Sequence, residues 1–132
     1  MTRVLFTIDK GTDLHTRAQF NRYIDTLSAM CKVSEPVHIG IGHWVDDEGV
    51  SWLEDCYSMT LKDFTRHIQP HGWCNDQDSV IVFDPDHVWI AAPDAPETPV
   101  KGCTITLTGD TMPAGNWVRF HNTTGGFYQV LT

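Results

Sequence analysis

Residues 37–61 read VHIGIGHWVDDEGVSWLEDCYSMTL, and this stretch decides the fold. Two β-prone runs, Val37–Val45 and Val50–Leu61, flank Asp46–Gly49, where Asp and Gly are the residues that tight turns use. The stretch therefore predicts a β-hairpin. Its acidic cluster is interpreted as a solvated turn, and a metal cage is the alternative.

The two faces of this hairpin differ, because successive side chains of a strand point to opposite sides. One face is aliphatic, with Ile39 and Met59 among its members, and suits packing against helices. The other carries Gly42, Trp44 and Glu54, an unusual set for plain solvent, and suits a subunit interface that holds a ligand. Glu54 is either an exposed strand glutamate or a partly desolvated carboxylate whose pKa is raised.

The segments on either side complete an α+β pattern. A strand over 3–8 precedes a helix, which Thr12 or Asp13 can cap. The apolar stripe of this helix is Leu14, Ala18, Tyr23, Ile24, Leu27 and Met30. A weaker helix is predicted over 62–73. Further strands are expected over 79–83, 87–92, 104–107, 117–120 and 127–131, with a proline-rich loop over 93–99.

The first ninety residues thus follow a β-α-β-β-α-β order, the pattern of a ferredoxin-like sandwich with helices on one face of an antiparallel sheet. The remaining strands are predicted as C-terminal additions to it. A chain of 132 residues is the size of one ordinary domain, so residues 1–132 are expected to form one unit.

Charge and composition exclude several classes of function. Seventeen acidic residues against nine Lys and Arg give a net charge of −8, which argues against binding a nucleic-acid backbone and favours cationic ligands or basic partners. No apolar run is long enough to span a membrane, and the start of the chain does not resemble a signal peptide. Four cysteines without CxxC spacing are typical of a reducing cytoplasm.

Two further patterns bear on possible chemistry. His67, His71 and Cys74 have spacings that could present zinc ligands, but Pro70 and Gly72 interrupt the helix and no fourth ligand lies nearby, so structural or surface roles are favoured. No nucleophile elbow, Walker loop, Rossmann fingerprint or HExxH motif occurs. We therefore expect no metal and no cofactor, and any chemistry needs little acid–base machinery.

Taken in order, short segments along the whole chain resemble the phage-encoded S-adenosylmethionine lyases, formerly called hydrolases. The segments are Gly42–Trp44, Glu54–Met59, Asp76–Val82, Trp89–Ala91, Val100–Gly102, Gly115–Trp117 and Gly126–Val130. Each is short, and the resemblance lies in their order and spacing. The run Gln77-Asp78-Ser79-Val80 followed by aliphatic residues is the most specific piece.

The resemblance implies an enzyme that cleaves S-adenosylmethionine to 5′-methylthioadenosine and homoserine lactone by attack of the substrate's own carboxylate. It implies a homotrimer with sites between subunits, in the cytoplasm of an infected host, where loss of the methyl donor counters restriction. Glu54 matches the family's functional glutamate. The family's tyrosine is replaced here by His43 or Trp44, and Gln77, Asp78 and Ser79 match the segment beside the adenosine.

A non-catalytic role is the alternative expectation. The same fold without the tyrosine would bind a small molecule without turning it over, as a sponge. The acidic charge would also suit a decoy for a DNA-binding defence protein.

Overall fold

The hairpin predicted from residues 37–61 is the centre of the structure, a computed structural model that describes residues 1–132. Strands β2 (His38–Val45) and β3 (Ser51–Thr60) pair antiparallel from His38–Ser58 to Val45–Ser51. In the turn, Asp46 Oδ1 accepts hydrogen bonds from the amides of Glu48 and Val50, both at 2.9 Å. Gly49 adopts a φ of 81°, which an L side chain would strain.

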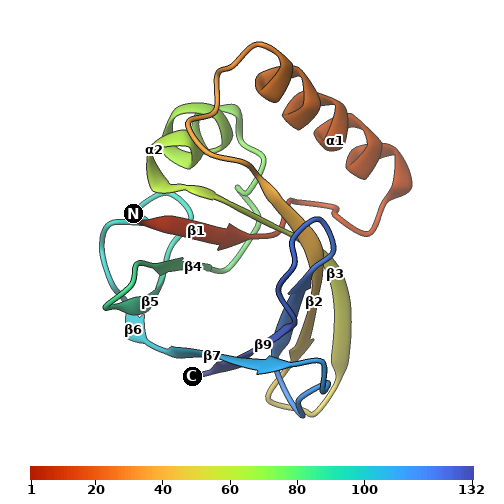
Figure 1. The fold of residues 1–132 in the computed structure, drawn as a ribbon, viewed down its shortest axis with the longest axis vertical. Coiled ribbons are helices and arrows are strands. Elements are labelled where there is room, and N and C mark those ends of the chain that lie inside the picture. The colour runs from red at the N-terminus through yellow and green to blue at the C-terminus, as the bar shows by residue number, and fades with distance from the viewer.

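The other elements extend this hairpin into one sheet with helices on its outer side (Figure 1). They are β1 (Arg3–Phe6), α1 (Leu14–Ala29), α2 (Leu61–Asp63), β4 (Val80–Phe83), β5 (Val88–Ala91), β6 (Lys101–Gly102), β7 (Thr104–Gly109), β8 (Trp117–Phe120) and β9 (Phe127–Leu131). The expectation of an α+β protein with an antiparallel sheet is confirmed. So is the entry of the C-terminal strands into that sheet.

The sheet has nine strands in the order β6-β5-β4-β1-β3-β2-β8-β9-β7, and every neighbouring pair is antiparallel. Its two edge strands, β6 and β7, follow one another in the chain with only Cys103 between them. The sheet must therefore curl so that its two edges approach one another, and Figure 1 shows the resulting near-barrel.

Two apolar clusters lie on opposite sides of the curled sheet. The outer cluster joins the helices to the sheet and contains Phe6, Phe20, Tyr57 and Phe64, whose rings contact one another. The inner cluster fills part of the concave side with Leu5, Cys56, Ile81, Val118, Phe120 and Val130. The side chains of β1, β3 and β4 alternate between the two clusters.

Helix α1 begins where predicted, because the carboxylate of Asp13 accepts from the amides of His15 and Thr16. The predicted apolar stripe is only partly correct. Leu14 is 72 % exposed, whereas Phe20, absent from that stripe, is fully buried with Ile24 and Leu27. The buried face follows the spacing i, i+4, i+7 from Phe20, so the stripe was set on the wrong residues at both ends.

The weaker helix predicted over 62–73 is instead three short pieces. One turn of α-helix, α2, passes into a π-helical segment, Phe64–Ile68, and then into a 3₁₀ turn, Gln69–His71. Pro70 lacks an amide hydrogen and Gly72 adopts a φ of 72°, so a continuous α-helix cannot form there. No helix of the structure is long and apolar enough to cross a membrane.

Candidate functional site

A cleft of about 730 Å³ opens at the end of β1, next to the predicted hairpin. Its walls are Leu5, Thr7, Trp44, Val45, Asp47, Trp52, Glu54, Gln77, Asp78, Ser79, Val80 and Ile81. This volume falls within the range of small-molecule sites. Five of the six residues predicted for the site meet here, two from the β2–β3 hairpin and three from the 77–79 segment.

The hairpin register brings Trp44, Trp52 and Glu54 to the cleft. Trp44 lies opposite Trp52, and Glu54 lies opposite Gly42, all on the concave side of the sheet. Gly42 is required here because a Cβ would lie 2.7 Å from Trp44 Nε1 and 2.5 Å from Cys56 Sγ. The absence of a side chain at Gly42 therefore lets the indole of Trp44 lie across the strand.

The segment that carries Gln77, Asp78 and Ser79 is tied to the end of β1. Thr7 Oγ1 donates to Gln77 Oε1 at 2.7 Å, and Gln77 Nε2 donates to the carbonyl of Ile8 at 3.3 Å. The amide of Asp76 donates to Asp9 at 2.8 Å. Gln77 is thus occupied in holding its segment in place. Asp78 and Ser79 are exposed at the cleft, where they are free to contact a ligand.

Glu54 is half-buried, and burial is the main cause that raises the pKa of its carboxyl, offset in part by the nearby hydroxyl of Thr7. Neither of the two ion pairs in the structure includes it. Burial, with the carboxylates of Glu54 and Asp55, also raises the pKa of the Cys56 thiol. Cys56 therefore stays protonated and is a poor nucleophile.

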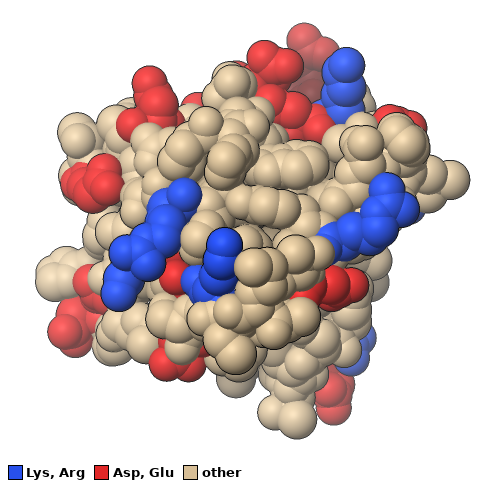
Figure 2. Space-filling model, turned by 90° about the horizontal axis from the view of Figure 1, so that it is seen from above, with Lys and Arg blue, Asp and Glu red and all other residues tan.

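All the charged side chains that line the cleft are acidic. Asp47, Glu54 and Asp78 line it, and no Lys or Arg does. Two tryptophans complete the walls, and indole faces attract cations. The face of the molecule in Figure 2 carries both Lys and Arg side chains and acidic ones. The cleft is chemically suited to a cationic ligand with an apolar or aromatic part.

His43 lies outside the cleft. Its ring stacks on Trp117 at 5.3 Å, and its Nδ1 is 2.7 Å from the carbonyl of Gly115. Neighbouring residues of a strand point to opposite faces, so only one of His43 and Trp44 can reach the concave side. That residue is Trp44, and the cleft contains no tyrosine.

The histidines and Cys74 considered as zinc ligands have other contacts. His67 Nε2 is 3.1 Å from the carbonyl of Lys32, the His71 ring packs edge-on against Tyr23, and buried Cys74 donates to the carbonyl of Thr7. No three His, Cys, Asp or Glu side chains are grouped so that they could hold a metal ion.

Thr7, Asp47 and Trp52 line the cleft but were not predicted as site residues. Trp52 could have been found, because it shares a strand face with Glu54. Nothing in the sequence around Thr7 or Asp47 separates them from ordinary strand-end and turn residues.

No protein-family model matches the chain, and neither a curated protein nor a solved structure matches it. The function must therefore be argued from the geometry and charge of the cleft.

Proposed function

We propose that the protein is an S-adenosylmethionine lyase and that the cleft around Glu54 binds the substrate. The observation that carries this proposal is the composition of the cleft, with three carboxylates, two tryptophans and no basic side chain. S-Adenosylmethionine carries a sulfonium, an ammonium and an adenine ring. A cleft of this chemistry favours both cations and offers aromatic faces to the sulfonium and the adenine.

The proposed reaction needs no external base or cofactor. The substrate's carboxylate attacks its own γ-carbon, the carbon–sulfur bond breaks, and the sulfur keeps the electron pair as a neutral thioether. The products are homoserine lactone and 5′-methylthioadenosine. Holding the two reacting groups in line is worth up to roughly 7–11 kcal/mol, which is enough for an enzyme without a nucleophile.

The residues of the cleft have distinct roles in this proposal. Glu54 binds the cationic end of the substrate and orients it, and Trp44 and Trp52 exclude water and face the sulfonium. Asp78 and Ser79 contact the ribose, and Gln77 holds their segment against β1. Attack cancels the opposite charges of carboxylate and sulfonium, so a site poor in water favours the transition state.

We include in the same proposal a ferredoxin-like core, a homotrimeric assembly and a cellular location. The strand order β4-β1-β3-β2, with α1 and α2 in the two crossovers, supports a ferredoxin-like core. The cleft is open, and in this proposal a second subunit of a homotrimer closes it, so that the sites lie between subunits. The proposed location is the cytoplasm of a phage-infected host, with anti-restriction as the biological use.

The test is to incubate the purified protein with S-adenosylmethionine and to measure 5′-methylthioadenosine by chromatography. We expect product from the parent and a loss of about 100-fold in kcat for Glu54→Gln, the lower end of the cost of removing one preorganised polar contact from an active site. Asp55→Asn is the matched control, because Asp55 points to the opposite face and pairs with Arg17 at 3.3 Å. No product from the parent at high enzyme concentration would overturn the proposal.

One observation favours a second candidate, a non-catalytic sponge. The cleft contains no tyrosine, so ligand could bind without being cleaved. This candidate predicts stoichiometric binding by calorimetry and recovery of intact S-adenosylmethionine after the protein is denatured.

A further inference from the structure

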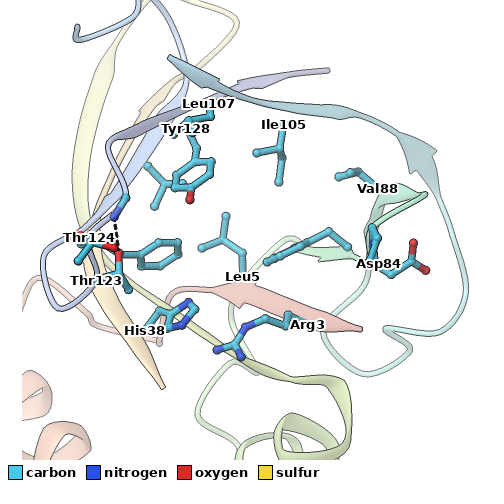
Figure 3. Close-up of a pocket in the computed structure, with 15 residues that line it drawn as sticks. Arg3, Leu5, His38, Asp84, Val88, Ile105, Leu107, Thr123, Thr124 and Tyr128 are labelled. Atoms are coloured by element: carbon cyan, nitrogen blue, oxygen red, sulfur yellow. Dashed lines mark hydrogen bonds between the residues drawn. The ribbon is translucent and has the colours of Figure 1, made fainter. Parts of the chain in front are cut away.

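A second cavity of about 630 Å³ lies on the concave side of the sheet, inside the near-barrel, and is distinct from the Glu54 cleft. Figure 3 shows this inner pocket between β1, β5 and the C-terminal strands. Leu5 is the one residue that lines both cavities. Trp44, Glu54 and the 77–79 segment do not reach the inner pocket, so the proposed lyase site leaves it unused.

The wall of the inner pocket is apolar over about half of its residues. Eight of its fifteen lining residues are hydrophobic, and Leu5, Val88, Ile105 and Tyr128 point into it (Figure 3). Asp84, the only acidic lining residue, lies at the edge of the pocket, where its carboxylate accepts from the amides of Asp86 and His87. Contact between these hydrophobic side chains and an apolar ligand body removes apolar surface from water, which favours binding.

Two polar side chains in this wall, those of Tyr128 and Arg3, are available to bind a polar group of a ligand. The hydroxyl of Tyr128 points into the pocket and forms no hydrogen bond within the chain, and Gly125 leaves room for it, since a Cβ there would lie 2.9 Å from that oxygen. Arg3 lies beside His38 at one end of the pocket. Its guanidinium donates to Ser58 Oγ and to the carbonyls of Ser58 and Pro36, all of them uncharged acceptors.

The positive charge of Arg3 has no direct partner. Neither of the two ion pairs includes it, although the carboxylates of Glu35 and Asp63 lie near enough to act on its pKa. The guanidinium is half-buried, and burial lowers the pKa of both Arg3 and His38. A half-buried charge without an ion-pair partner is stabilised by an anion more strongly than an exposed one is.

We propose that the inner pocket is a second ligand site, which takes a small molecule with an apolar body and a carboxylate head. The body lies among Leu5, Val88 and Ile105, and the carboxylate faces Arg3. The volume of about 630 Å³ falls within the range of small-molecule sites. The Tyr128 hydroxyl supplies a hydrogen bond to a ligand oxygen.

The test uses octanoate and octan-1-ol as probes, an acid and a neutral compound of the same chain length, in calorimetric titrations at pH 7. We expect octanoate to bind at least tenfold more tightly than octan-1-ol. Arg3→Gln should remove this preference and leave octan-1-ol binding unchanged. Arg3→Lys, which retains the positive charge, should keep most of the preference for octanoate. Absence of binding by both probes at millimolar concentration would overturn the site.

A filled pocket provides the second measurement. Val88→Trp places an indole in the inner pocket and should abolish octanoate binding, whereas Val100→Trp, the same change at a residue 73 % exposed and outside the pocket, should bind as the parent does. Circular dichroism establishes that each variant is folded, and Ile105→Trp replaces Val88→Trp if the latter is not. Octanoate binding with the parent's affinity in a folded variant whose pocket is filled would contradict the proposal. Neither measurement depends on S-adenosylmethionine cleavage, so both test the inner pocket separately from the proposed lyase activity.

Discussion

Glu54 has a proposed role in function, and its partial burial lowers the stability of the folded protein at neutral pH. Burial favours its protonated form, so the pKa of the carboxyl is higher in the folded than in the unfolded chain. Over the pH range between the two values the folded state holds a proton that the unfolded state has lost. Stability therefore falls as pH rises from the unfolded pKa, about 4.3, through the folded one, and stays lower at neutral pH.

Glu54→Gln should accordingly be more stable than the parent at pH 7 while losing activity. The gain should shrink as the pH falls through about 4 and vanish below it, where the parent carboxyl is protonated in both states. Urea denaturation at several pH values measures this difference. The same pH dependence in parent and variant would show that Glu54 is hydrated in the folded protein.

Gly42 is the second residue on which the cleft depends. A methyl group at this position overlaps the Trp44 indole and the Cys56 sulfur. Gly42→Ala should lower the free energy of unfolding by about 1–3 kcal/mol, as overpacking does, and change the tryptophan fluorescence as Trp44 moves. Gly102→Ala is the control, because a Cβ at Gly102 meets nothing within 4 Å. Equal stability of the two variants would contradict this account of Trp44.

At the scale of elements, the joint between β2 and β8 connects the first part of the sheet to the C-terminal strands. The side chain of Asn122 extends this joint, since its Oδ1 accepts from the amide of Ile39 at 2.7 Å and its Nδ2 donates to the carbonyl of Val37 at 2.9 Å. At the other end, Asn116 Oδ1 accepts from the amide of Val45 at 2.8 Å. The two asparagines fasten β8 to both ends of β2.

Asn122→Ala should therefore destabilise the fold by about 1–3 kcal/mol, the sum of two hydrogen bonds of ordinary strength. The amide of Ile39 should also exchange with solvent faster than in the parent. His121→Ala is the matched control, because His121 is exposed and contributes its backbone amide, not its side chain, to this joint. Unchanged exchange at Ile39 would mean that Asn122 is not needed to hold β8.

The elements that sequence reasoning found are those whose local signals agree with one another. The hairpin, β8 and β9 were placed well because aromatic and β-branched runs are bounded there by turn residues. Strand β6 was missed because two residues, Lys101 and Gly102, carry no pattern of their own. Phe20 was missed because an isolated aromatic residue among polar neighbours does not show which face of α1 is buried.

The site was predictable only in part for a related reason. Strand parity indicates that Glu54 and Trp52 share a face, but it cannot show that the 77–79 segment reaches them. That contact depends on hydrogen bonds between Gln77 and the end of β1, across seventy residues of chain. The inner pocket was not predictable at all, because it exists only once the sheet has curled.

At the scale of the whole molecule, the two apolar clusters share the strands of a single curled sheet. Cys74 belongs to the outer cluster and Cys56 to the inner one. Burial raises the pKa of Cys74 to about 12, and that of Cys56 also lies above its ordinary value. Neither thiol is reactive while the protein stays folded.

Thiol labelling at pH 8 should therefore occur in stages. The exposed Cys31 reacts first, the half-buried Cys103 more slowly, and Cys56 and Cys74 only when the chain unfolds, both at the same rate. Mass spectrometry of the labelled peptides follows each thiol separately. Earlier labelling of Cys56 would show that the inner cluster opens on its own.

The form of the two edge strands has a consequence for how copies of the chain can associate. Strand β6 has only two residues, and β7 departs from regular pairing between Leu107 and Gly109. Short or bulged borders offer a poor template to a neighbour's backbone, which is how natural β-proteins avoid fibre growth. The proposed trimer would then form through side chains on the molecular faces, and the protein should remain dispersed at concentrations where open-edged sheets precipitate.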